Sequence, residues 1–175
     1  VDLETVRKIE LIMKQLGLRP EDRRVVSPAV EKSNQTNAPA LAIELPSGEI
    51  VTGRTTDLMD CSASSILNSI KRLAGLADDL LMLSPIILEP ILKLKRHSLG
   101  DRHPILNLEE VLIALSISAA TNPIAELAMT KLDELDGCEA HCTGILRPSD
   151  ETIFRKLGMN ITCGPEYMSD DLFEQ

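Results

Sequence analysis

Apolar residues near the start of the chain recur at three- and four-residue steps: Leu3, Val6, Ile9, Met13 and Leu16. This spacing predicts a helix from about residue 2 to residue 16 with one apolar face to bury, and Gly17 can end it in the left-handed conformation. Residues 18–39 contain three prolines and the polar run SNQTN and show no sustained period. We therefore expect residues 1–39 to form a leading helix and a linker arm.

A hairpin is predicted next. ALAIEL and EIVTGR are two short strand-like runs, and the turn Pro46-Ser47-Gly48 separates them. The following helix, from about residue 61 to residue 74, has Asp57 or Asp60 as its cap. The apolar run DDLLML, residues 78–83, then suits a buried strand that leads into a helix with proline in its first turn and an end near Lys95.

The second half alternates helices and strands. Asn107 and Glu110 form a capping pattern for an apolar helix, and Pro123 restarts a helix that runs to about residue 135. CEAHCTGIL is a strand, SDETIFRKLG a short helix and MNITC a last strand. This order predicts one α/β domain over residues 40–175, with a mixed, mostly parallel sheet of about five strands, an N-terminal hairpin and helices on both faces. The topology is loosely cytidine-deaminase-like, which says little about chemistry.

Composition narrows the possible partners. The chain has 175 residues, a net charge of -9, no Trp, one Tyr and two Phe. This charge disfavours nucleic-acid binding, and the longest apolar run is far shorter than the ~20 residues of a membrane helix. Four cysteines without a disulfide-like framework point to a cytoplasmic protein, and a start at Val1 without Met suggests a cut inside a longer one.

The stretch GCEAHCT is the first candidate site. Cys138, His141 and Cys142, with Cys163, could in principle supply a three-cysteine, one-histidine zinc set. In a strand, however, His141 faces away from both neighbouring cysteines, so we favour a packed core strand and predict no metal site. A disulfide between Cys142 and Cys163 is geometrically possible but disfavoured in the cytoplasm.

Catalytic motifs are incomplete. Cys61 lies at the start of a helix, where a thiolate is favoured, but Asp57 and Asp60 oppose that charge, so packing is the better explanation. A zinc deaminase needs His-x-Glu or Cys-x-Glu and Pro-Cys-x-x-Cys, whereas the chain has CSASS and LSPIILEP in those places. The sequence identifies no cofactor.

One segment is placed like an anion site. Arg54, Thr55 and Thr56 lie between a strand and a helix, although Asp57 and Asp60 would oppose an anion and a simple cap would also explain them. Neither nucleotide-binding glycine motif is present. We take Arg54, Thr55, Thr56 and His141 as candidate ligand-binding residues at the strand ends, where open α/β sheets bind ligands.

Three long runs carry a resemblance: SGEIVTGRTTDLMDCSASSILNSIKRLAGL, NLEEVLIALSISAATNPIAELAMTKL and GCEAHCTGILRPSDETIFRKLGMNITCGPEY. They resemble the C-terminal part of an uncharacterised bacterial family, domain-of-unknown-function family number 1846, over about residues 40–167 and the leading helix. The resemblance implies a longer protein whose preceding part carries a glycine-rich segment like a phosphate loop. It supplies no catalytic residues.

Two hypotheses follow. The first is a non-catalytic C-terminal domain that packs on, or regulates, the nucleotide-loop-bearing part of a larger cytoplasmic protein, or that forms a homo-oligomer. The second is a binding or enzyme domain for a phosphorylated metabolite or nucleotide, with its pocket at the strand ends.

Overall fold

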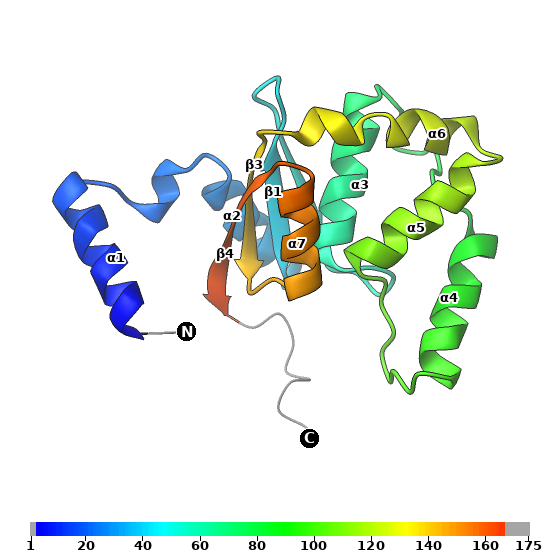
Figure 1. Ribbon diagram of the computed structural model, residues 1–175, viewed down its shortest axis with the longest axis horizontal. Coiled ribbons are helices and arrows are strands. Elements are labelled where there is room, and N and C mark those ends of the chain that lie inside the picture. The colour runs from blue at the N-terminus through cyan, green and yellow to red at the C-terminus, as the bar shows by residue number, and fades with distance from the viewer. Residues whose placement is uncertain (1–2, 167–175) are drawn as a thin grey trace.

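The computed structural model describes residues 3–166 (Figure 1). In chain order its elements are α1 (Leu3–Leu16), the 3-10 helix η1 (Pro20–Asp22), α2 (Val26–Thr36), β1 (Ala40–Glu44), β2 (Ile50–Arg54), α3 (Cys61–Leu73), α4 (Pro85–His97), α5 (Leu108–Ala119), α6 (Pro123–Met129), the 3-10 helix η2 (Leu132–Leu135), β3 (Glu139–Gly144), α7 (Pro148–Lys156) and β4 (Asn160–Glu166). The predicted α/β class and hairpin are confirmed.

The four strands form one mixed sheet in the order β2-β1-β3-β4. β1 is antiparallel to both β2 and β3, and β3 is parallel to β4. The expected count of about five strands and the parallel majority are therefore wrong for residues 3–166. The missing strand is residues 78–83, which form turns and irregular chain. The four-strand order alone does not establish the cytidine-deaminase-like topology.

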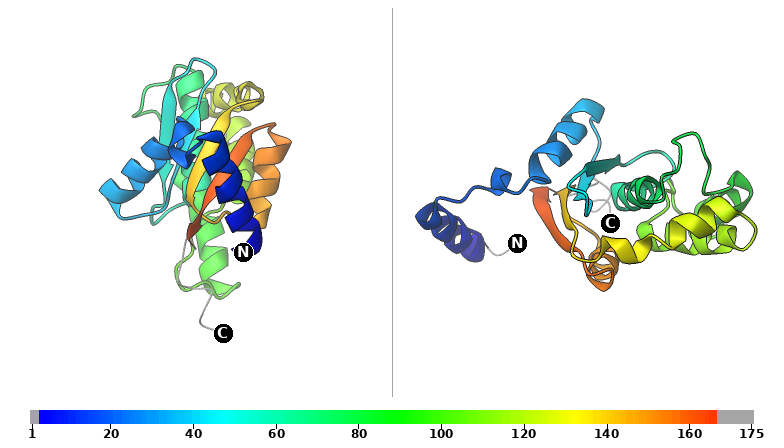
Figure 2. Two further views of the ribbon diagram at one scale, coloured as in Figure 1. Left: turned by 90° about the vertical axis from the view of Figure 1, so that its left-hand side faces the viewer. Right: turned by 90° about the horizontal axis from the view of Figure 1, so that it is seen from above.

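Helices cover both faces of the sheet (Figure 2). α2 packs on one face, where Val25 and Ala29 are buried against Ala42 of β1. This helix corrects the expectation of an irregular arm over residues 18–39. Its Pro28 lies in the first turn, where no intrahelical N–H bond is lost, so proline does not prevent a helix here. The domain division at residue 39 stays a prediction.

The main core lies between the other face of the sheet and the helices α3, α5 and α7. β1 contributes Leu41 and Ile43, which are fully buried and point to this face. The helices meet them with Ile66 of α3 and Leu115 of α5, and Phe154 of α7 is a fully buried aromatic side chain among them. The core is therefore almost entirely aliphatic, as the composition requires.

α3 lies unusually close to β2, because glycine occupies position 53. A Cβ atom built there would be 2.2 Å from the backbone N of Ser65 and 2.6 Å from its Cα. The first five residues of α3, CSASS, are all small and buried. Small residues on the helix and Gly53 on the strand let the two backbones approach, and this approach positions the loop between them.

α1 stands apart from this body (Figure 1). Of the stripe that the spacing predicted to need burial, Ile9 is exposed by 52% and Leu16 by 66%, while Met13 is half-buried; Ile12, beside the stripe, is exposed by 54%. Within residues 3–166, no helix has both the length and the apolar character required to cross a bilayer.

The close approach predicts a large cost for a methyl group at position 53. Gly53→Ala should lower the free energy of unfolding by roughly 2–4 kcal/mol, since the contacting atoms are backbone and α3 must shift. Urea denaturation followed by circular dichroism measures this. Gly75→Ala is the control, because its positive φ costs only about 1 kcal/mol and nothing lies within 4 Å of the new Cβ. Equal losses in both variants would contradict the predicted clash.

Candidate functional site

Residues 54–60 connect the end of β2 to the start of α3 and contain most of the predicted site. The loop is fixed to residue 106 by two backbone hydrogen bonds: Asp60 N–H donates to the Leu106 carbonyl at 3.0 Å, and Leu106 N–H donates to the Leu58 carbonyl at 2.9 Å. Asp60 caps α3, since its Oδ1 accepts from Ala63 N–H at 2.9 Å. Of the two predicted caps, Asp60 is therefore the correct one.

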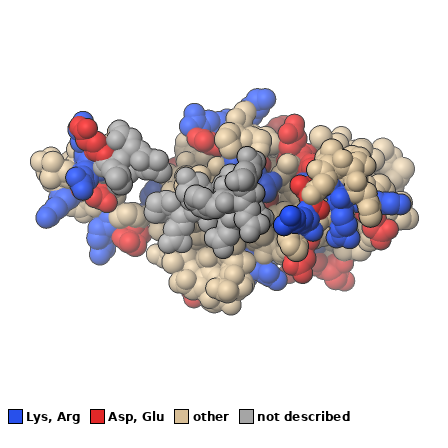
Figure 3. Space-filling model, turned by 90° about the horizontal axis from the view of Figure 1, so that it is seen from below, with Lys and Arg blue, Asp and Glu red and all other residues tan. Residues whose placement is uncertain are grey.

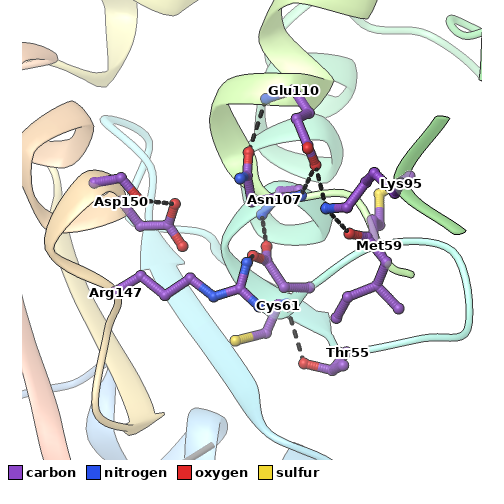
Figure 4. A network of polar contacts seen from close by, with 12 residues as sticks. Thr55, Met59, Cys61, Lys95, Asn107, Glu110, Arg147 and Asp150 are labelled. Carbon is purple, nitrogen blue, oxygen red and sulfur yellow. Dashed lines mark hydrogen bonds and ion pairs between the residues drawn. The ribbon is translucent and has the colours of Figure 1, made fainter. Parts of the chain in front are cut away.

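The two threonine hydroxyls are occupied by their own loop. Thr55 Oγ1 accepts from Cys61 N–H at 3.1 Å (Figure 4). Thr56 Oγ1 accepts from the N–H groups of Leu58 and Met59, at 3.2 and 3.1 Å. These bonds shape the turn before α3, so both threonines have a structural function whether or not a ligand binds nearby.

A groove of about 430 Å³ opens beside this loop, at the end of β2. Arg54 and Thr56 line it, together with Asn68 and Lys71 of α3 and the segment 80–83. The segment that was predicted as a strand thus forms a wall of this groove. Thr55 is not among the lining residues, although its neighbours on both sides are.

His141 does not join the groove. It belongs to the same cross-strand row as Ala42 and Thr162, on the face that α2 covers, and its Nδ1 lies 2.8 Å from Thr162 Oγ1. Arg23 contacts Glu139 and Thr162 beside it. Burial, and then the charge of Arg23, lower the pKa of His141, so it is neutral at physiological pH. Two strand spacings, or about 10 Å, separate its row position from β2.

The alternation predicted for GCEAHCT is confirmed. Ala140, Cys142 and Gly144 are buried in β3, while His141 and Thr143 lie on the opposite face and are half-buried. Cys163 is exposed and pairs with Cys142 across the parallel strands. Among residues 3–166, no three His, Cys, Asp or Glu side chains are placed to bind a metal ion together.

Two thiols meet inside the core. Cys61 Sγ and Cys142 Sγ are 3.7 Å apart and both are buried (Cys61 is shown in Figure 4). The hydrogen bond with Cys142, and then burial, raise the pKa of Cys61 well above its ordinary value. Cys61 is therefore a thiol rather than a thiolate nucleophile at neutral pH, which agrees with the packing interpretation.

Behind the loop lies an acidic pair that the sequence did not reveal. Asp60 is 2% exposed and Asp150, in the first turn of α7, is fully buried. Arg147 Nη1 is 3.9 Å from Asp60 Oδ2. Among the described residues, neither Asp60 Oδ2 nor Asp150 Oδ2 has a hydrogen-bond partner. Asp150 is 90 positions from Asp60 in a short polar helix, so no local pattern marked it as buried.

Burial dominates the chemistry of this pair. It raises the pKa of Asp60 to about 6, against the backbone hydrogen bond from Ala63, and it raises the pKa of Asp150 as well. The positive charge of Arg147 opposes both shifts. Burial thus moves the titration of both carboxyls toward neutral pH, as it does for general acids. Because both side chains are closed off from solvent here, the pair cannot meet a substrate in this arrangement.

A buried lysine completes the polar surroundings (Figure 4). Lys95 Nζ donates to the Ile105 carbonyl at 2.7 Å and to Glu110 Oε2 at 2.9 Å. Glu110 also accepts from Asn107 N–H, and Asn107 Oδ1 accepts from Glu110 N–H, both at 2.9 Å. This reciprocal capping box was predicted from the sequence. The capping box and Lys95 fix residues 105–107, and the loop of residues 54–60 is hydrogen-bonded to Leu106 in this segment.

Comparison with known proteins identifies the family. The protein-family model described as "Domain of unknown function DUF1846, C-terminal" matches residues 21–173 of the sequence. The chain belongs to this family. The chain is also 48% identical over 181 residues to a UPF0371 protein of Clostridium botulinum (strain Langeland). That match covers 99% of this chain and 36% of the C. botulinum protein. A UPF0371 protein of Clostridium tetani (strain Massachusetts) is 47% identical with the same coverage. The chain thus spans about a third of these relatives' length.

The acidic pair predicts a pH-dependent stability for this DUF1846 C-terminal domain. Folding raises the pKa of Asp60 from 3.8 to about 6. The contribution of protonated Asp60 to the free energy of unfolding is therefore fully present below about pH 3.8 and is lost as the pH rises through 6. Asp60→Asn keeps the capping oxygen and cannot ionise. From pH 4 to pH 7, its free energy of unfolding should improve relative to wild type by up to roughly 3 kcal/mol.

Denaturant titrations at several pH values test this expectation. Asp57→Asn, at an exposed loop position, is the matched control and should track the wild type throughout. A difference between Asp60→Asn and wild type that is constant from pH 4 to pH 7 would show that Asp60 is not perturbed by burial.

The four cysteines should differ sharply in reactivity. Exposed Cys163 should react with Ellman's reagent about 100-fold faster than buried Cys61 and Cys142, because reaction needs an accessible thiolate. Cys163→Ser should remove the fast phase, while all remaining thiols should react in urea. A fast phase that survives in Cys163→Ser would place a second thiol at the surface.

Proposed function

We propose that this chain is a non-catalytic C-terminal domain that packs on the part of a longer protein outside the chain, and that α1 makes the contact. The observation that carries the proposal is the open apolar stripe of α1. Ile9, Ile12 and Leu16 recur at three- and four-residue steps and are all more than half exposed. Fully burying one such side chain stabilises an interface by about 1.5–3 kcal/mol.

The size of the relatives supports a partner within the same protein. The chain covers 36% of the C. botulinum and C. tetani UPF0371 proteins, and the family description names this part C-terminal. About two-thirds of a protein of that length would remain to cover α1. The resemblance of the sequence to family 1846 implies that this remaining part carries a segment like a phosphate loop, so any nucleotide chemistry would belong there.

The buried titratable groups and the bonded loop hydroxyls of the domain favour a structural rather than a catalytic function. Three groups with raised pKa values, Asp60, Asp150 and Cys61, are buried and closed to solvent. The loop hydroxyls bind their own backbone. A cytoplasmic location belongs to the same proposal, and it is supported by four cysteines in the thiol form, two of which have their sulfur atoms 3.7 Å apart.

The test is binding between two separately produced parts: this chain and the remainder of the same protein. Isothermal titration should show association. Ile9→Lys combined with Ile12→Lys should raise the dissociation constant by at least about tenfold, because charges would enter the apolar contact. Leu11→Lys is the matched control. Leu11 is 58% exposed and lies about 100–160° around α1 from the three stripe residues, and its replacement should change the constant less than twofold.

Two results would overturn the proposal. One is a wild-type chain that does not bind the remainder at all. The other is equal weakening by the stripe variant and by Leu11→Lys. Sedimentation of the chain alone identifies the competing occupant: a dimer that Ile9→Lys with Ile12→Lys converts to monomer, without binding to the remainder, would replace docking by self-association.

A further inference from the structure

The groove beside residues 54–60 is lined by that loop and by other parts of the chain. β2 contributes Arg54, α3 contributes Leu67 and Lys71, the connection before α4 contributes residues 80–83, and α2 contributes Lys32. Its volume of about 430 Å³ falls in the range of small-molecule pockets, and it opens at the carboxyl end of β2. It is separate from α1, which contributes none of its lining.

The floor of the groove is aliphatic. Its apolar lining consists of leucine and methionine: Leu58, Met59, Leu67, Leu80, Leu81, Met82, Leu83 and Leu88. Met82, Leu83 and Leu88 are buried, while Leu81 is 69% exposed at the mouth. The lining has no aromatic ring on which a nucleobase could stack, so these walls suit a flexible aliphatic body better than a base.

The charged part of the lining is cationic. Lys32, Arg54 and Lys71 all line the groove, and its described lining contains no carboxylate. Within residues 3–166, none of the three forms a salt bridge with an acidic side chain. Arg54 donates to the Thr55 carbonyl at 3.2 Å and Lys71 to the Asp78 carbonyl at 2.6 Å. A guanidinium has five N–H donors and an ammonium has three, so each keeps free donors.

The charge of the whole chain makes this arrangement informative. With a net charge of -9, acidic partners are plentiful, and Arg23, Arg24 and Arg72 each pair with a glutamate. The acidic residues near the groove do not line it. Asp78 accepts a hydrogen bond from Lys71 through its backbone oxygen, and Asp57 is exposed on the loop outside the lining. Three cations around an aliphatic floor therefore form a local field opposite to that of the protein.

We propose that this groove binds a small amphipathic anion, a carboxylate or phosphate monoester that carries an aliphatic chain. The anionic head lies among Lys32, Arg54 and Lys71, where charge-assisted hydrogen bonds are strongest, and Asn68 at the edge adds a neutral polar group. The aliphatic chain lies along the leucines. This site is independent of docking through α1, because the two share no residue.

Decanoate and decyl phosphate are the probes, used below their micellar concentrations on the complete chain. Isothermal titration should give saturable binding of one molecule per chain. 1-Decanol, which lacks the charge, and acetate, which lacks the chain, should each bind at least about tenfold more weakly. Comparison of the two anions identifies the preferred head group.

Variants separate the groove from general surface binding. Arg54→Gln with Lys71→Gln should weaken decanoate binding by about tenfold or more, whereas Lys93→Gln, at an exposed position of α4 outside the groove, should have no effect. Leu81→Asp should also weaken binding by repelling the anion at the mouth. Its control is Ile86→Asp, at a side chain that is 82% exposed and outside the lining.

Three outcomes would overturn the proposal: no saturable binding of either anion, equal affinity for 1-decanol and decanoate, or equal losses in the groove variants and their controls. Because Leu81 and Ile86 are both highly exposed, their variants are expected to fold, which circular dichroism confirms independently of binding. Failure of this test leaves the α1 experiment unaffected, since that experiment measures a different surface.

Discussion

The contact between Gly53 and the first turns of α3 determines where both groups of functional side chains lie. With no Cβ at position 53, the backbone of Ser65 can rest directly on β2. The start of α3 is then held between the sheet and residue 106, and the loop 54–60 must turn sharply over it. One side of this loop faces the cationic groove, and the other faces the buried carboxyls. A larger residue at position 53 would disturb both.

The two sides of the loop 54–60 differ in the sign and the burial of their charged groups. Asp60 and Asp150 are buried with Arg147 as the nearby cation, and burial raises their pKa values, because it disfavours the ionised form of each carboxyl. At the groove, the three cations stay near solvent and lack acidic partners among residues 3–166. Elsewhere on the surface, basic and acidic side chains are interspersed, as on the face in Figure 3. A cationic groove in so acidic a chain is best explained by a ligand.

Local patterns in the sequence predicted those parts of the fold that depend on near neighbours. The hairpin, the capping box at Asn107 and the alternation along β3 are all short-range features, and all are confirmed. The run DDLLML misled because hydrophobicity alone does not distinguish a paired strand from an irregular segment that covers a groove. α2 was missed because it buries so few side chains that no periodic stripe results.

The candidate site was less predictable, for the same physical reason. Arg54 and Thr56 were found because they lie between a strand and a helix. Lys32 comes from α2 and Lys71 from the last turn of α3, and neither has a local signature. His141 was grouped with Arg54 because both were predicted to line a pocket at the strand ends. The strand order places β1 between their strands and turns His141 toward α2, which separates them. Without the order of the strands, that separation could not be deduced.

The connection between α1 and α2 explains how docking and the groove can remain independent. Arg23 binds Glu139 of β3, and Arg24 binds Glu44 of β1. These two ion pairs hold the start of α2 in place on the sheet. Lys32 is on this anchored helix and lines the groove. α1 lies before both arginines and is joined to them through Gly17, whose φ of +68° is left-handed, and the short helix η1. A change in the direction of α1 at Gly17 or η1 therefore need not move the anchored helix α2 or its Lys32.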